Sequence, residues 1–312
     1  MKQVNVSVLL PVYNAGDTLA QAIKSILNQT LPDFELLIID DASTDDSAVV
    51  IRQYASQDSR IKPIFHNVNQ GLTATLNEGL NLAQSDYVAR MDQDDESLPN
   101  RLQVQWDYLQ AHPDIVVAGS FVYHMGTQPE YDRLVELPIE NSQIQETLKQ
   151  YNCLYHPSVM MRRNPILAIG GYRPEFKNAE DYDLWLRVSK VYQLANIPQP
   201  LLRYRFSLQG MTLSRKWEQL FYVYLAQSAH QIEPYSLDIA SEKAKEMLEQ
   251  TDKRYFLKQV AIGTVNELTS LRAWREAVVL IFLFRSDIGL ESSIKLLNYV
   301  ITQILKLHFY RP

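Results

Sequence analysis

The chain has 312 residues, of which 46% are hydrophobic and 21% charged, so it is long enough for one large domain or two smaller ones and is not of disordered or collagen-like composition. Its single cysteine, Cys153, excludes an internal disulfide and any multi-cysteine zinc site. The net charge of −6 argues against binding nucleic acid through a broad basic face. We therefore expect a small-molecule partner and no nucleic acid.

The N-terminal segment and the hydrophobic runs bear on where the protein works. Residues 1–10 alternate polar and apolar positions, unlike the continuous apolar stretch of a signal peptide. The longest clear apolar run, 277–284, is far shorter than the roughly 18 residues that span a bilayer. We expect a cytoplasmic protein without a transmembrane helix.

Short apolar runs alternate with segments of helical period in the first part of the chain. Strands are predicted at 4–10, 35–39, 61–65, 87–91 and 115–118, with helices at about 18–27, 46–55, 72–83 and 99–111. Thr18 and Gln21 have the spacing of a capping box at the first helix. This rhythm predicts repeated βα units and a largely parallel sheet.

Regularity falls between 121 and 205, where seven prolines divide the chain into short pieces and only 181–191 is typical of a helix. From about residue 213 the pattern is almost purely helical. We therefore predict an α/β domain over 1–212 and a helical region over 213–312.

The last sixty residues are basic as well as apolar. Residues 252–312 contain nine Lys or Arg and five Asp or Glu. A basic amphipathic region can lie on the surface of an anionic membrane, and an apolar stripe can equally pack on the body of the protein or on a second copy. Both alternatives stay open. If the C-terminal region lies on a membrane, the expected cytoplasmic protein would be peripheral on the inner face of the cell membrane.

Three acids follow the predicted strand at 87–91, within ARMDQDD at 89–95. If the chain stays extended, Asp92 and Asp94 point to one side and Asp95 to the other. Paired carboxylates at the carboxyl end of a strand suit Mg²⁺ or Mn²⁺ bridging to phosphates. The alternative is a solvated acidic loop.

Polar loops also follow the first two strands. The segments PVYN at 11–14 and DDAS at 40–43 should lie side by side and form a nucleotide cradle, with Asp41 accepting a hydrogen bond from the base. Asp41 at the start of a helix is alternatively a cap. Further on, Glu180 and Asp181 begin a predicted helix near Trp185, where acids either stabilise the helix terminus or supply a general base.

A series of motifs in a fixed order resembles the family 2 glycosyltransferases over roughly residues 4–205. The motifs are PVYN (11–14), DDASTDD (40–46), NQG (69–71), ARMDQDD (89–95), HPSVMMRR (156–163), GGYR (170–173) and AEDYDLWLR (179–187). The resemblance implies the GT-A fold, a mostly parallel doubly wound α/β sheet flanked by helices, and a place in bacterial surface-polysaccharide synthesis.

The resemblance also implies roles for particular residues. Asp181 would be the catalytic base, with Glu180 orienting it. Asp94 would ligate the metal directly, Asp92 would lie nearer the ribose or sugar, and His156 would reach the metal or the diphosphate. The donor nucleotide sugar would be held by Pro11, Val12, Tyr13, Asn14, Asp41, Asn69, Gly71, Arg90 and Asp92.

The expected reaction is an inverting transfer from a nucleotide diphosphate sugar, foremost a UDP-sugar, to a saccharide or lipid-linked saccharide, with Mn²⁺ or Mg²⁺. No G-x-S-x-G nucleophile motif is present, which fits a single displacement. A sugar-phosphate nucleotidyltransferase is a weaker alternative, because the loop PVYNAGD has one glycine and no basic residue. A non-catalytic sugar-nucleotide-binding scaffold would lack the metal pair or the base, and this chain has both.

Overall fold

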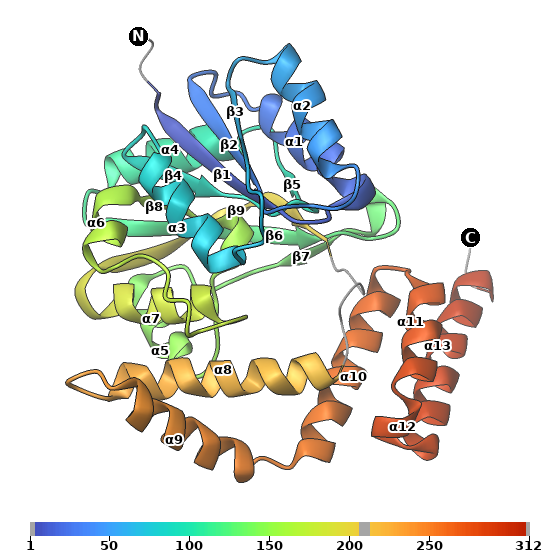
Figure 1. Ribbon diagram of the computed structural model, residues 1–312. Coiled ribbons are helices and arrows are strands. Elements are labelled where there is room, and N and C mark those ends of the chain that lie inside the picture. The colour runs from blue at the N-terminus through green and yellow to red at the C-terminus, as the bar shows by residue number, and fades with distance from the viewer. Residues whose placement is uncertain (1–3, 206–212, 310–312) are drawn as a thin grey trace. The chain divides into compact units, whose positions relative to one another are not determined.

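The computed structural model describes residues 4–205 and 213–309 (Figure 1). These residues form two compact units, each of which has most of its contacts within itself. Among the described residues, the first comprises residues 4–123 together with Leu134–Arg205. The second comprises His124–Arg133 and residues 213–309.

The first unit is built on a nine-stranded mixed sheet with the order β3-β2-β1-β4-β8-β6-β9-β5, and β7 pairs with β6. Strands β1, β2, β3 and β4 run parallel, whereas the pairs β4–β8, β6–β8 and β5–β9 are antiparallel. The strands are β1 (Val6–Val12), β2 (Phe34–Asp40), β3 (Ile61–Phe65), β4 (Tyr87–Arg90), β5 (Glu96–Ser97), β6 (Ile115–His124), β7 (Arg133–Val135), β8 (Met160–Arg162) and β9 (Gln193–Tyr204).

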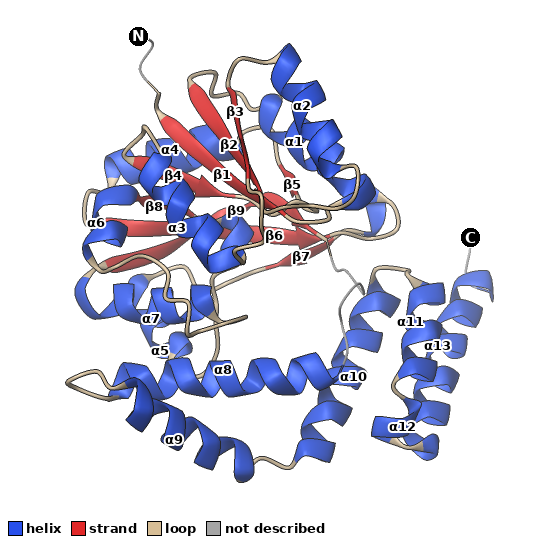
Figure 2. Ribbon diagram, viewed as in Figure 1, coloured by secondary structure: helices blue, strands red, loops and turns tan. Residues whose placement is uncertain are grey.

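Helices cover both faces of this sheet (Figure 2). On one face, Leu19 and Ile23 pack with Val8 in a continuous apolar core. On the other face, Gly79 lies so close to β1 that an added Cβ would fall 2.1 Å from Leu9 Cδ1. The helices are α1 (Leu19–Leu27), α2 (Ser47–Gln57), α3 (Leu72–Leu82), α4 (Arg101–Ala111), α5 (Asn141–Leu148), α6 (Arg163–Ala168) and α7 (Glu180–Val191), with short 3-10 turns at Gly16–Thr18 and His156–Ser158. A further 3-10 turn, Pro129–Tyr131, belongs to the segment of the second unit.

The five predicted strands and four predicted helices are present, with bounds within two residues of the prediction, except that β6 continues beyond 118 to His124. The predicted capping box of Thr18 and Gln21 is wrong. Thr18 makes no side-chain cap bond, and its hydroxyl donates instead to the carbonyls of Ala15 (2.9 Å) and Gln93 (3.2 Å). Residue 18 is thus used to fix the loop before α1 against the acidic loop after β4.

The segment after residue 121 is more regular than its prolines predict. Strand β9 is 12 residues long and contains Pro198 and Pro200. Prolines two residues apart remove backbone donors from the same side of a strand, so they leave the other side free to pair. That strand completes the sheet beside β6 and β5.

The second unit is helical: α8 (Leu213–Gln231), α9 (Leu237–Glu249), α10 (Lys253–Ser270), α11 (Trp274–Leu283), α12 (Arg285–Ile288) and α13 (Leu290–Phe309). Leu268, Leu280 and Val300 belong to its buried apolar core. Glu267 of α10 accepts hydrogen bonds from His124 Nδ1 (2.7 Å) and Arg133 Nε (3.0 Å), which attaches the segment His124–Arg133 to this unit. Within 4–205 and 213–309, no helix is both long and apolar enough to cross a bilayer.

Candidate active site

The loops that follow β1, β2 and β4 are hydrogen-bonded to one another. Tyr13 N donates to Gln93 Oε1 (2.8 Å), and Gln93 Nε2 donates back to Tyr13 O (3.1 Å). Asn14 N donates to Ser43 Oγ (2.9 Å), while Asn14 Oδ1 accepts from Thr44 N (2.8 Å). The loops at the carboxyl ends of these parallel strands therefore lie side by side, as the sequence predicts.

The PVYN motif divides between strand and loop. Pro11 and Val12 are buried at the end of β1, in register with Ile39 and Asp40 of β2. Tyr13 is 47% exposed, so its ring is open to a ligand, and the exposed Asn14 adopts a positive φ of 48°. Among these four residues, only Tyr13 and Asn14 present side chains to solvent.

Asp41 is almost fully buried and is held by the NQG motif. Its carboxylate accepts from Gln70 N and Gly71 N, both at 2.8 Å, and Asn69 Nδ2 donates to its carbonyl (3.1 Å). Gly71 has a φ of 87°, a conformation that glycine adopts without strain. The predicted role of the Asp41 carboxylate is to accept a hydrogen bond from a nucleobase. Two backbone N–H groups of this loop already donate to it, so fewer of its lone pairs remain for a base.

His66 was not identified from the sequence. Its Nδ1 lies 2.7 Å from Asp41 Oδ1 and its Nε2 lies 2.6 Å from Glu78 Oε2. Burial disfavours the charged imidazole, but hydrogen bonds to these two carboxylates prevail and raise the pKa of His66. Its position directly after β3, at the same edge of the sheet as the other loops, is the feature of the sequence that could have indicated it.

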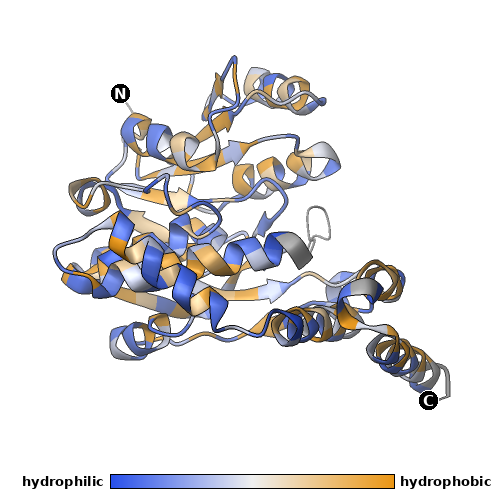
Figure 3. Ribbon diagram, turned by 60° about the horizontal axis from the view of Figure 1, so that its bottom comes forward, coloured by the Kyte–Doolittle hydropathy of each residue, from blue (hydrophilic) through white to orange (hydrophobic). Residues whose placement is uncertain are grey.

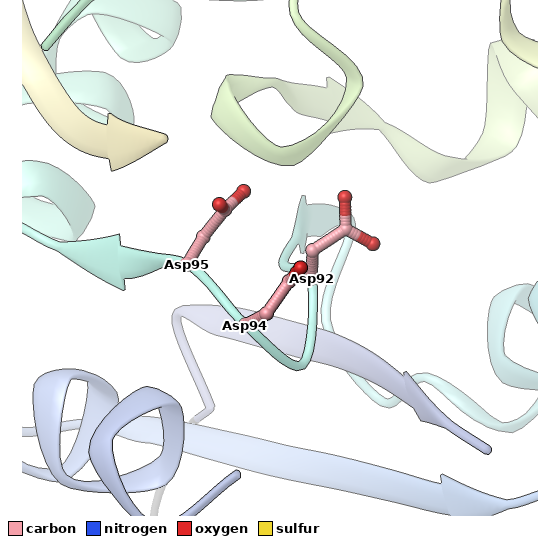
Figure 4. Close-up of side chains that lie close together, drawn as sticks. All are labelled: Asp92, Asp94 and Asp95. Atoms are coloured by element: carbon pink, nitrogen blue, oxygen red, sulfur yellow. The ribbon is translucent and has the colours of Figure 1, made fainter. Parts of the chain in front are cut away.

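Asp92, Asp94 and Asp95 place carboxylate oxygens within 4.8 Å of one another. Figure 4 shows that the three side chains leave the loop on the same side. The expectation that Asp95 points away is wrong, because the chain turns at Gln93 and Asp94 instead of staying extended. Asp95 is therefore a third member of the acid cluster.

The carboxylates of the cluster repel one another in a buried setting. Burial and the charge of Asp92 raise the pKa of Asp94, and burial with the charges of Asp92 and Asp94 raises the pKa of Asp95 well above its usual range. Asp95 Oδ1 accepts from Arg205 N (2.7 Å), whereas its buried Oδ2 has no hydrogen-bond partner among the described residues. Three converging carboxylates with an unused oxygen fit a hard divalent cation.

Arg90 lies buried beside the acid cluster. It forms an ion pair with Asp92, and although burial opposes its charge, Asp92 raises the pKa of Arg90. Its Nε has no hydrogen-bond partner among the described residues. Beneath it, the fully buried Arg101 donates to the Arg90 carbonyl (2.7 Å), which fixes the end of β4.

His156 does not join the acid cluster among the described residues. Its Nε2 lies 2.8 Å from the Tyr172 hydroxyl, and its ring lies edge-on to Trp185. Burial, together with the charge of Arg90, lowers the pKa of His156 well below its usual range. A neutral imidazole in this setting packs against α7 rather than against the three aspartates.

The acid pair at the start of α7 is the second group of catalytic candidates. Asp181 Oδ1 accepts from Tyr182 N (2.7 Å) and its Oδ2 from Asn152 Nδ2 (2.8 Å). Burial raises the pKa of Asp181, and burial with the charge of Asp181 raises the pKa of Glu180 to about 7. Arg90 and Asp92 also act on Glu180, so the acid pair and the acid cluster lie within electrostatic reach of each other.

The third acid of this motif is a structural anchor. Asp183 is buried and accepts from Arg173 Nε (3.0 Å) and Arg187 Nε (2.9 Å). Arg187 also donates to Gly171 O (2.6 Å). The GGYR and AEDYDLWLR motifs thereby hold each other, which anchors the first turn of α7.

Comparison with known proteins identifies the family of this chain. The family model for Glycosyl transferase family 2 matches residues 7–170. The chain belongs to this family. It is 32% identical over 219 residues to the amylovoran biosynthesis glycosyltransferase AmsE of Erwinia amylovora, an alignment that covers 69% of this chain and 81% of that protein.

Solved structures extend the likeness to the fold. TarS residues 1–349 of S. aureus, in complex with UDP, match with a TM-score of 0.59 at 16% identity, covering 98% of this chain and 93% of that one. The mannosyltransferase PcManGT of Pyrobaculum calidifontis, in complex with GDP-Man and Mn²⁺, matches with a TM-score of 0.59 at 15% identity, covering 97% and 86%. The first unit has the GT-A fold predicted from the motifs.

Proposed function

We propose that this family 2 glycosyltransferase transfers a sugar from a nucleotide diphosphate sugar to an acceptor hydroxyl with inversion, in the synthesis of a bacterial surface polysaccharide. The observation that carries the proposal is the approach of two acidic groups. The cluster of Asp92, Asp94 and Asp95 lies beside Arg90, and the charges of Arg90 and Asp92 both act on Glu180 at the start of α7.

The donor is proposed to lie on the loops that follow the parallel strands. Tyr13 supplies an exposed ring for the nucleoside, and Asn14, Asp41 and the loop of Asn69 and Gly71 form its surroundings. Two proteins of similar fold have been solved with nucleotides: TarS in complex with UDP, and PcManGT in complex with GDP-Man and Mn²⁺. A UDP-sugar is the first donor to test, followed by GDP-mannose.

Asp92, Asp94 and Asp95 would hold the divalent cation, Mn²⁺ or Mg²⁺. When bound there, the cation supplies positive charge for the diphosphate leaving group. Arg90 already provides one buried positive charge at the same place. The chain thus concentrates cationic groups where negative charge develops.

Asp181 is proposed to remove the acceptor proton. Asn152 and Tyr182 N hold its two oxygens, so the carboxylate is oriented before the acceptor arrives. The acceptor oxygen then attacks the anomeric carbon as the bond to the diphosphate breaks, and this single displacement inverts the configuration. Glu180, with a pKa of about 7, stays partly protonated beside Asp181 and limits the negative charge of the pair.

The test of this function is Asp181→Asn, measured with a donor sugar nucleotide and a saccharide acceptor. A positioned base is worth ~10²–10⁴ in rate, so transfer should fall at least a hundredfold while UDP affinity stays unchanged. The matched control is Glu146→Gln, an exposed acid on α5 of the same unit. A variant that turns over at the parental rate would sink the base assignment.

Metal-dependent hydrolysis of the donor without acceptor separates an enzyme from a non-catalytic sugar-nucleotide-binding scaffold. The parent should release sugar slowly with Mn²⁺ and not with EDTA, and Asp94→Asn should abolish the release. Nucleotide binding without any turnover under these conditions would favour the scaffold.

We further propose that residues 1–212 carry out catalysis and that residues 213–312 attach the enzyme to its place of work. The acceptor is proposed to be a saccharide or a lipid-linked saccharide. A lipid-linked acceptor would bring the protein to the inner face of the cell membrane. Contact of the C-terminal helices with that membrane, or with a second copy, would provide this attachment.

A further inference from the structure

Two neighbouring helices of the second unit expose large apolar side chains. On α11, Phe282 and Leu283 are 61% and 65% exposed, and on α13, Leu290 and Ile294 are 63% and 49% exposed. The four-residue helix α12 joins these ends of α11 and α13, so the four residues lie at one end of the helix pair. We call them the apolar end.

The apolar end is separate from the core of the unit. The same helices bury Leu280 and Ile281 on α11 and Val300 on α13 inside that core. In Figure 3 the helix that leads to the C-terminus carries hydrophobic and hydrophilic stretches along its length. The helices therefore have a second set of apolar residues that folding of the unit does not bury. Large exposed apolar residues gathered in one place mark an interaction surface.

A cavity lined by charged residues of both signs borders the apolar end. Its volume is about 390 Å³, and it lies between the first turns of α10 and the junction of α12 with α13. Arg254 and Lys258 of α10 line it together with Asp252 and Glu291, and Leu290 belongs both to its wall and to the apolar end. Both carboxylates have partners, because Asp252 Oδ1 accepts from Tyr255 N (2.9 Å) and Glu291 forms an ion pair with Lys295 (2.6 Å). The exposed ring of Tyr255 stands beside them. Positive charge and apolar surface thus meet at one rim.

The distribution of charge selects the partner. Residues 252–312 contain nine basic and five acidic residues, so they carry +4 in a chain whose total is −6. The remaining residues therefore carry −10. An anionic bilayer attracts the C-terminal helices and repels the rest, whereas two copies meeting through the same surface would bring two positive regions together.

We propose that the apolar end and its neighbouring cavity form a binding site for an anionic membrane surface. The phosphate of a lipid headgroup enters the cavity between Arg254 and Lys258, and Phe282, Leu283 and Ile294 enter the acyl boundary. Tyr255 lies at the level of the headgroups, where amphipathic rings are favoured. This site deepens the membrane contact proposed above and does not depend on the glycosyl transfer.

The test is co-sedimentation of the full chain with vesicles of phosphatidylcholine alone, or of phosphatidylcholine with one third phosphatidylglycerol. The parent should bind the anionic vesicles at least tenfold more tightly. Arg254→Gln/Lys258→Gln should remove that preference. Phe282→Ser/Leu283→Ser should weaken binding to both vesicles by at least tenfold.

Two double variants in the first unit serve as matched controls, one for the loss of two positive charges and one for the loss of two apolar side chains. Lys24→Gln/Lys62→Gln changes two exposed cations, and Val49→Ser/Val68→Ser changes two exposed apolar residues. Both should bind vesicles as the parent does. Equal binding of the parent to both vesicles, or equal losses in the controls, would overturn the proposal.

Two further outcomes would assign this surface to a different ligand. Full competition by inorganic phosphate would indicate a small-anion site and overturn the membrane assignment. Dissociation of a parental dimer by Phe282→Ser/Leu283→Ser, measured by sedimentation velocity without vesicles, would identify an interface between copies instead. UDP binding and donor hydrolysis should be unchanged in every variant, so a failure here leaves the proposed enzyme activity intact.

Discussion

Replacing Glu180 by glutamine should stabilise the protein at alkaline pH. Glu180 is 8% exposed, and burial with the neighbouring charge of Asp181 raises its pKa from the ordinary 4.5 to about 7. The folded protein therefore favours the protonated acid, and ionisation at higher pH costs stability. Glutamine keeps the shape of the side chain and cannot ionise.

The magnitude follows from the shift. One pKa unit corresponds to 1.36 kcal/mol, so a rise from 4.5 to about 7 gives an upper limit of about 3 kcal/mol. Because the folded pKa is the higher one, the stability that protonation contributes is complete below about pH 4.5 and is lost as the pH rises through about 7. The advantage of Glu180→Gln should therefore be near zero at low pH and largest above about pH 7.

Urea unfolding of parent and variant, followed from about pH 5 to about pH 8 in EDTA and without nucleotide, measures this gap. Glu146→Gln is the control, because that exposed acid should give a small and nearly pH-independent difference. If Glu180→Gln were no more stable than the parent near pH 8, or if its advantage were constant over the range, Glu180 would not be a strained buried acid.

Two further predictions concern the metal site and the sheet. Mn²⁺ affinity, measured by titration calorimetry, should rise with pH above the ordinary range of a carboxyl group and should release protons, because the carboxyl groups of Asp94 and Asp95 have raised pKa values and must ionise to bind. An affinity independent of pH would count against this cluster. Gly79→Ala should lower the free energy of unfolding by ~1–3 kcal/mol, because the new Cβ would fall 2.1 Å from Leu9 Cδ1. Gly263→Ala in α10, where no atom lies within 4 Å of the added carbon, should be neutral or slightly stabilising, and equal effects of the two would contradict the packing.

The local elements and the position of the candidate site could be predicted because they depend on short-range pattern. Apolar runs of strand length and helical periodicity need only neighbouring residues, and they indicated the strands and helices of the first part of the chain. Parallel strands bring their carboxyl ends to one edge, which is why the loops of Tyr13, Ser43 and Gln93 were expected together and are hydrogen-bonded together.

What the sequence left open depends on contacts between distant residues. The side on which Asp95 points depends on a turn at Gln93 that is held by Tyr13, 80 residues away. The pairing of His66 with Asp41 and Glu78 requires β2, β3 and α3 to be assembled.

The C-terminal helices show the same division. Their basic and apolar composition was evident from the residues alone, but a helical period does not say which of two apolar sets is buried. Only the packed unit buries Leu280 and leaves Phe282 exposed. Periodicity is a local property, so the sequence by itself determines which helices form and which apolar side chains each one carries. Which of these side chains become buried, and which residues they contact, is decided only when segments far apart in the chain pack together.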